Sequence, residues 1–227
     1  MSIKTPLRKE KIKTHFTYGL WKYALLAILA VFGWNMIYTT TSYRPPEDKK
    51  VNFYVVSGSA SYDVIAPRMK SIHEAIFPDM EEVSVVTLMG GEDPNAVMQL
   101  SVYIMAGEGD VYLLPYADFY SYARQGAFMP LDEYAESGAL NLRGIDVSAG
   151  YQTIDADGED SLPERHLFGI PTYELNGFIE NYWIDSRDMV LCVLYRNGND
   201  ENSVKLVDYL IGENLAELPE RLQETEQ

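Results

Sequence analysis

The longest hydrophobic stretch lies near the start of the chain. Residues 23–38 read YALLAILAVFGWNMIY without a charge, and aromatic residues stand near both ends. With its flanks, residues 18–41, the stretch matches the ~20 residues that cross a bilayer as a helix. A buried core helix is the alternative, but the basic leader and the Arg44-Pro45-Pro46 exit favour a membrane span.

A second pattern follows, in which short β-branched runs alternate with helically spaced apolar residues. The runs at 51–56, 81–89 and 110–115 predict strands. The segments 62–77, 95–106 and 116–125 predict helices, with Pro67 expected in the first turn of its helix, where no backbone donor is lost. This β-α-β-α-β-α order predicts an α/β fold, a doubly wound and mostly parallel sheet with helices on both faces.

The second half of the chain is less regular. YQTI (151–154), HLFGIP (166–171) and MVLCVLY (189–195) are strand-like, and residues 131–137 and 201–211 predict helices. The last dozen residues are rich in charge, and we expect them to fray.

Charge separates the two parts of the chain and predicts an orientation. Residues 1–44 hold seven Lys and Arg against one Glu, a net of +6, and the rest hold 11 against 33 Asp and Glu, a net of −22. The positive-inside rule keeps the basic N-terminus in the cytoplasm and places the acidic domain outside the cell. An uncleaved signal anchor is favoured over a cleaved signal peptide, because the outer flank lacks an A-x-A-like cleavage pattern. A domain this acidic is a poor partner for nucleic acid, whose phosphates are neutralised by Lys and Arg.

Three segments of the acidic part resemble bacterial extracellular solute-binding proteins, which deliver small solutes to ABC importers. They are GDVYLLPYADFYSYARQGAFMPLDEY (109–134), RHLFGIP (165–171) and VLYRNGNDENSVKLVDYLIGE (193–213). The resemblance covers most of residues 51–213 and rests on the order of the segments. It implies a non-enzymatic solute-binding module of the two-lobed, periplasmic-binding-protein-like class.

The chain departs from that family in two ways. About twenty residues separate the Gly-Ile-Pro strand from the returning strand, too few for a second α/β lobe. The anchor is an apolar helix where the family commonly uses a lipid, and the only cysteine is Cys192. We therefore expect a single lobe, which needs a partner to supply the opposite wall of a ligand site.

The candidate ligand site follows from the fold. Open α/β sheets bind ligands beyond the carboxyl ends of their strands, where helix N-termini and free backbone amides gather. The alternative is that these loops are ordinary turns whose tyrosines cap the core. The expected ligand-binding residues are Ser57, Gly58, Ser59, Met89, Gly90, Gly91, Tyr116 and Tyr173.

Metal binding and catalysis have less support. Asp155, Asp157, Glu159 and Asp160 crowd one loop, but the spacing of an EF-hand is not met, so a solvated acidic turn is favoured over a calcium site. Cys192 lies in an apolar run that predicts a buried side chain rather than a reactive thiol. The sequence lacks HExxH, GxSxG and phosphate-loop motifs, and no cofactor or catalytic residue is expected.

These expectations divide the chain into five parts. They are a cytoplasmic tail (1–17), a transmembrane signal anchor (18–41), a linker (42–50), a solute-binding-like lobe (51–215) and an acidic tail (216–227). The expected protein is a single-pass plasma-membrane protein that binds a sugar or a peptide outside the cell, with membrane lipid around its anchor and an ABC permease or a sensor as partner. The alternative is a protein-interaction scaffold that has lost its ligand.

Overall fold

A computed structural model describes residues 9–41, 43, 45–91, 93–154, 164–195 and 198–215. The chain separates into two compact units, residues 1–44 and 45–227. The first described element is a single long helix, α1 (Lys9–Thr41). Within it, Gly19–Thr41 is long and apolar enough to cross a membrane, and none of its most hydrophobic window is buried, unlike the core helix of a globular domain.

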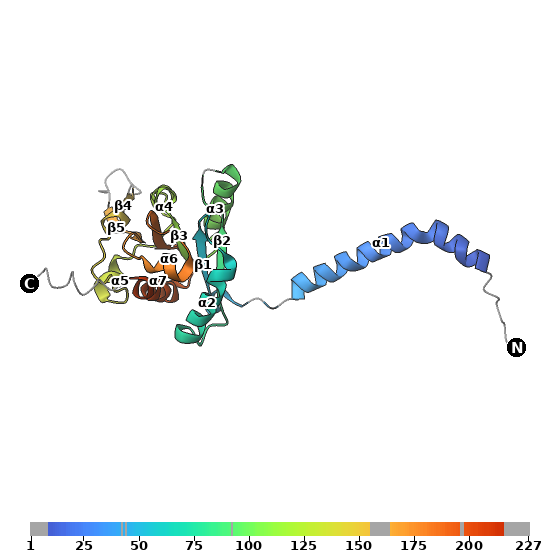
Figure 1. The fold of residues 1–227 in the computed structure, drawn as a ribbon, viewed down its shortest axis with the longest axis horizontal. Coiled ribbons are helices and arrows are strands. Elements are labelled where there is room, and N and C mark those ends of the chain that lie inside the picture. The colour runs from blue at the N-terminus through green and yellow to red at the C-terminus, as the bar shows by residue number, and fades with distance from the viewer. Residues whose placement is uncertain are drawn as a thin grey trace, which may run out of the picture. The chain divides into compact units, whose positions relative to one another are not determined.

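The second unit is built around a five-stranded sheet (Figure 1). Its strands are β1 (Lys50–Val56), β2 (Glu82–Leu88), β3 (Val111–Pro115), β6 (Gly169–Pro171) and β7 (Met189–Val193), in the order β2-β1-β3-β7-β6. β1 pairs in parallel with β2 and β3, whereas β7 is antiparallel to both β3 and β6. Four of the five strands therefore point the same way, and the predicted mostly parallel α/β sheet is confirmed.

Helices cover both faces of this sheet because its central strands are apolar on both sides. Phe53 and Val55 belong to one core cluster with α2 (Tyr62–Ile76), α6 (Gly177–Tyr182) and α7 (Asp200–Asn214). Tyr54 and Val56 belong to the other, with α3 (Pro94–Ala106) and α4 (Tyr116–Ala123). Alternate side chains of a strand point to opposite faces, so β1 contributes to both cores.

The remaining elements are short. They are α5 (Asp132–Ser137), the 3-10 helices η1 (Glu47–Lys49) and η2 (Ser148–Gly150), and a separate hairpin of β4 (Tyr151–Ile154) and β5 (Glu164–Leu167).

Three local predictions were wrong or incomplete. Pro67 lies inside α2, beyond the first turn in which it was expected. HLFGIP is not one strand: β5 ends at Leu167 in the hairpin, and β6 begins at Gly169 in the main sheet. Helix α6 was not predicted from the sequence, although its buried side chains Phe178 and Tyr182 are spaced one helical turn apart.

Candidate functional site

The two ends of the strands define two edges of the sheet. We call the carboxyl edge the side where β1, β2, β3 and β6 end and β7 begins, and the amino edge the opposite side. All eight residues predicted to bind a ligand follow strand ends at the carboxyl edge. Adjacent strands lie ~4.8 Å apart, so the row from the end of β2 to the end of β6 spans ~19 Å.

The loops after β1 and β2 lie against each other. The amide of Ser57 donates to the carbonyl of Leu88 at 3.0 Å. A Cβ on Gly90 would stand 3.3 Å from the Cα of Ser57, so glycine permits this close approach. The hydroxyls of Ser57 and Ser59 lie 3.0 Å apart and share a hydrogen bond. Met89 beside them is 67% exposed. These loops therefore combine polar hydroxyls with an exposed apolar side chain.

Tyr116 follows β3, the next strand in the row. Its amide donates to the carbonyl of Asp188 at 3.0 Å, which ties the end of β3 to the start of β7. Its ring is half-buried and lies 6.2 Å from the ring of Phe119 and 6.4 Å from that of Tyr120. Tyr116 thus belongs partly to the core and partly to the carboxyl edge.

Tyr173 lies at the far end of the row, after β6. Its ring is 40% exposed, and its hydroxyl donates to the carbonyl of Asp146 at 3.1 Å. Desolvation, together with the carboxylates of Asp146 and Glu174, raises the pKa of Tyr173 to about 12, so the hydroxyl stays protonated at neutral pH. Two strands, β3 and β7, separate β1 from β6, so Tyr173 does not join the Ser57 loop in one small site.

The structure adds apolar residues to this side that the sequence analysis did not propose. Tyr62 opens α2 directly after the β1 loop and is exposed. Ile179 and Trp183 belong to the connection between β6 and β7, and both are exposed. Trp183 is 67% exposed and has a φ of 57°, a left-handed conformation that is uncommon for a bulky residue. No repeat or motif in the sequence marks these positions.

Helix starts set the electrostatics of the carboxyl edge. α2, α3 and α4 all begin there, so their positive dipole ends face this side. Asp93 caps α3 by accepting a hydrogen bond from the amide of Asn95 at 2.7 Å, whereas Ser61 makes no side-chain cap on α2. Burial raises the pKa of Asp118 in the first turn of α4.

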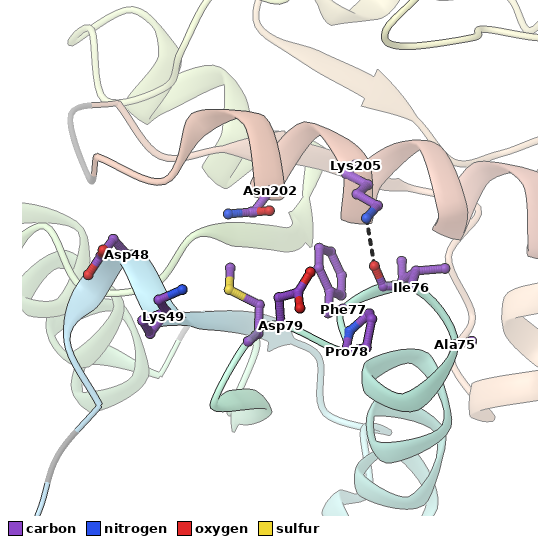
Figure 2. Close-up of a pocket in the computed structure, with 10 residues that line it drawn as sticks. Asp48, Lys49, Ala75, Ile76, Phe77, Pro78, Asp79, Asn202 and Lys205 are labelled. Carbon is purple, nitrogen blue, oxygen red and sulfur yellow. Dashed lines mark hydrogen bonds between the residues drawn. The ribbon is translucent and has the colours of Figure 1, made fainter.

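The amino edge holds a cavity of about 580 Å³ (Figure 2). Lys205 on α7 donates to the carbonyl of Ile76 at 2.6 Å, and its ammonium lies 5.0 Å from the centre of the Phe77 ring. The lining mixes both charges with apolar side chains from segments far apart in the sequence, and no sequence motif predicted it. The lining residues are Asp48, Lys49, Ala75, Ile76, Phe77, Pro78, Asp79, Met80, Asn202 and Lys205.

A buried polar network closes the amino edge next to this cavity. Asp110, 5% exposed, accepts hydrogen bonds from the Asn52 amide at 2.6 Å and from the Asn199 side chain at 3.3 Å. The same Asn199 side chain donates to the carbonyl of Lys50 at 2.6 Å. These bonds join β1, β3 and the start of α7, as expected for buried polar groups that hold a fold.

The cysteine and two of the histidines have structural surroundings. Cys192 is fully buried, as predicted, and burial raises the pKa of its thiol well above the usual value. The ring of His73 lies 2.9 Å from the carbonyl of Met80, and that of His166 lies 3.2 Å from a carboxylate oxygen of Asp132. The four acids of the predicted acidic turn lie outside the described residues. Within the described ranges, no group of three His, Cys, Asp or Glu side chains could hold a metal ion.

No protein-family model matches the chain, and no curated protein matches it. Several solved structures are similar to part of it, and they belong to the class that the sequence resembles. An extracellular solute-binding protein of family 1 from Alicyclobacillus acidocaldarius is 21% identical, with a TM-score of 0.37, over 57% of this chain and 29% of its own.

Two further solved structures are of the same kind. An ABC substrate-binding protein from Listeria monocytogenes, in complex with cycloalternan, is 22% identical with a TM-score of 0.35 over 53% of this chain and 28% of its own. An N-glycan transport solute-binding protein from Streptococcus pneumoniae is 16% identical with a TM-score of 0.37 over 54% and 24%. The chain thus spans less than a third of the length of each of these three proteins.

Proposed function

We propose that this protein is a membrane-anchored, non-enzymatic binding module that takes a small neutral or cationic solute, such as a sugar or a peptide, on its carboxyl edge. Residues 18–41 are the anchor, and residues 51–215 are the binding lobe, held outside the cell by the basic cytoplasmic tail. An ABC permease or a sensor is the partner. A net charge of −22 on the residues after Arg44 disfavours an anionic ligand.

One observation carries the proposal: exposed aromatic, methionine and hydroxyl side chains line the row of strand ends at the carboxyl edge. Met89, Tyr62, Tyr173 and Trp183 stay exposed there, although apolar side chains of this size gain free energy from burial. A tyrosine or tryptophan face stacks on an apolar ligand surface while its polar rim forms hydrogen bonds. The connection 172–188 holds only α6 and no second lobe, so the bound solute needs a further wall from a partner.

The test is a ligand screen on the full chain in lipid nanodiscs. A ligand that binds only the folded state raises the melting temperature by mass action. We expect one class among neutral oligosaccharides, amino acids and short peptides to do so. Tyr173→Ala should weaken its binding by about two- to tenfold, because stacking of an aromatic ring contributes ~0.5–1.5 kcal/mol.

Tyr195→Ala is the matched control. Tyr195 is also an exposed tyrosine, but it follows β7 at the amino edge. Its removal should leave binding unchanged. If no class of solute shifts the melting temperature, or if the two variants weaken binding equally, the proposal fails.

A protein-interaction scaffold is the second candidate, and α3 is the observation that favours it. The helix carries no charged residue, although it belongs to a strongly acidic unit. Its outward face exposes four apolar side chains, Val97, Met98, Val102 and Met105. Apolar patches of this kind are typical of protein contacts. Failure of the whole ligand screen would favour this candidate.

A further inference from the structure

The span of α1 contains a carboxamide side chain that the helix does not satisfy. Asn35 lies about 9 Å along the axis from the end of the span at Thr41, well inside a hydrocarbon core of ~30 Å. The hydroxyl of Thr39 donates to the Asn35 carbonyl at 2.9 Å, and that of Thr41 to the Ile37 carbonyl at 2.7 Å. The side-chain amide of Asn35, by contrast, has no hydrogen-bond partner in the described part of the chain. Lipid tails offer it none, and an unpaired amide in hydrocarbon costs several kcal/mol.

Asn35 lies in a regular stripe along α1. The stripe follows a spacing of four, three, four and three residues, the repeat with which two helices pack along one seam. Ile28 and Asn35 are seven residues apart and so occupy equivalent positions in this repeat. A shallow groove of about 400 Å³ accompanies the stripe, lined by Ala27, Ile28, Val31, Phe32 and Asn35. The stripe consists of Ala24, Ile28, Val31, Asn35 and Tyr38.

We infer that α1 pairs in parallel with α1 of a second copy of this chain, with the two Asn35 side chains hydrogen-bonded across the seam. The inference rests on the proposed role of α1 as a membrane anchor. A carboxamide both donates and accepts, so it is complementary to itself across a two-fold axis. Copies inserted with the same orientation are necessarily parallel.

The polar residue in the stripe also selects a register. A single asparagine in such a seam fixes the register of the pair. The opposite face of α1 offers Leu26, Leu29, Met36 and Ile37, which lipid solvates without a partner.

Pairing also deepens the proposed function. Two paired anchors hold two lobes at a high effective concentration, because each lobe is tethered to the same helix pair. The second copy is then a candidate for the missing wall of the ligand site.

Cysteine cross-linking of the full chain in its membrane tests the seam. The native Cys192 is fully buried, so it does not compete for the oxidant. We expect Ile28→Cys and Val31→Cys to form a disulfide-linked dimer on oxidation, and Leu29→Cys on the opposite face to form at least threefold less. Adding Asn35→Val to Val31→Cys should lower the dimer yield about three- to tenfold, the range for one hydrogen bond between membrane helices.

Met36→Val on the same Val31→Cys background is the matched control, because it changes an apolar residue outside the seam. It should leave the dimer yield unchanged. Equal cross-linking on both faces, no effect of Asn35→Val, or a disulfide to a different protein would each overturn the inference.

An alkaline carbonate wash separates this inference from the proposed function. A chain that stays in the membrane pellet but does not cross-link retains its anchor and refutes only the pairing. A chain released into the supernatant refutes the membrane anchor, and the pairing inference falls with it.

Discussion

The two edges of one sheet use their polar side chains differently. At the amino edge Asp110 and Asn199 are buried and hydrogen-bonded, and they link β1, β3 and α7. At the carboxyl edge the loops after β1 and β2 expose hydroxyls, and Met89 and Tyr173 remain exposed. The difference teaches that buried polar bonds at the amino edge stabilise the fold, whereas the loops after β1 and β2 and Tyr173 at the carboxyl edge leave side chains exposed.

Cavity volume alone would favour the amino edge as the ligand site. The cavity of about 580 Å³ lies at the amino edge, where Lys205 already donates to the Ile76 carbonyl and covers the Phe77 ring. Its charged lining includes both signs, from Asp48, Lys49 and Asp79. The carboxyl edge is a row of strand ends with exposed side chains, and it is the edge on which the proposed function rests.

The largest expected effect contrasts a glycine at each edge. Gly109→Ala, next to Asp110, should destabilise the fold by about 3 kcal/mol. Gly109 has a φ of 88°, and an added Cβ would lie 2.5 Å from the ring of Tyr54, which stacks on Tyr112 at 4.9 Å. Denaturant unfolding of the full chain in mild detergent measures the loss.

Gly58→Ala is the counterpart at the carboxyl edge. Gly58 has nothing within 4 Å of an added Cβ and is not among the glycines with positive φ. Its replacement should change the free energy of unfolding by less than about 1 kcal/mol. Equal losses for the two variants would contradict the contrast between the edges.

Much of the sheet follows from local sequence. Residues 53–56, 85–86 and 111–114 are all β-branched, aliphatic or aromatic, because a strand segment covered on both faces has no solvent side to mark with polar residues. α6 was missed because it is short and lies in the polar stretch 172–188. The break between β5 and β6 was not predicted, because the residue at the junction, Phe168, is apolar and continues the strand pattern from one strand into the next.

The candidate site was predictable only in its position. Strand ends locate the loops of Ser57, Met89 and Tyr116, because the order of the elements determines which edge they share. The exposure of Trp183 depends on the left-handed end of α6, and that of Tyr62 on how α2 packs. The amino-edge cavity joins residues 75–80 to α7, more than 120 residues later, so only tertiary packing creates it.

A smaller expected effect is the pH dependence of stability, which differs between a buried carboxyl group at the amino edge and an exposed one on the carboxyl side. Burial raises the pKa of Asp110 above its ordinary value, outweighing the hydrogen bonds from Asn52 and Asn199, while Glu47 raises it further and Lys50 lowers it. The folded state therefore binds the proton more tightly than the unfolded state, and this contribution to stability declines as pH rises from about 3.9 through the raised pKa. In denaturant titrations from pH 4 to pH 7, wild type should lose more stability with rising pH than Asp110→Asn.

Asp185 on the carboxyl side provides the control of opposite sign. Hydrogen bonds from Arg187 lower the pKa of Asp185 to about 2. Its contribution is present above its ordinary pKa of about 3.9 and is lost as pH falls toward 2. Asp185→Asn should therefore match the wild-type pH dependence above pH 5. If Asp185→Asn, rather than Asp110→Asn, flattens the profile there, the assignment of the two edges is wrong.

The smallest expected effect on stability falls on Ser57, in the loop after β1. Ser57→Ala removes an exposed hydroxyl that bonds to the Ser59 hydroxyl at 3.0 Å and accepts from the Ser59 amide at 3.3 Å, so the free energy of unfolding should change by less than about 0.5 kcal/mol. Binding of the solute should weaken several-fold, because a hydrogen bond to a ligand contributes ~0.5–1.5 kcal/mol.

Tyr116→Ala should weaken binding too, but with a loss of stability, because its half-buried ring packs near Phe119. Calorimetric titration measures the solute binding of both variants, and denaturant unfolding measures their stability. If both bind the solute as wild type does, the loops after β1 and β3 are ordinary turns, and the ligand site lies elsewhere.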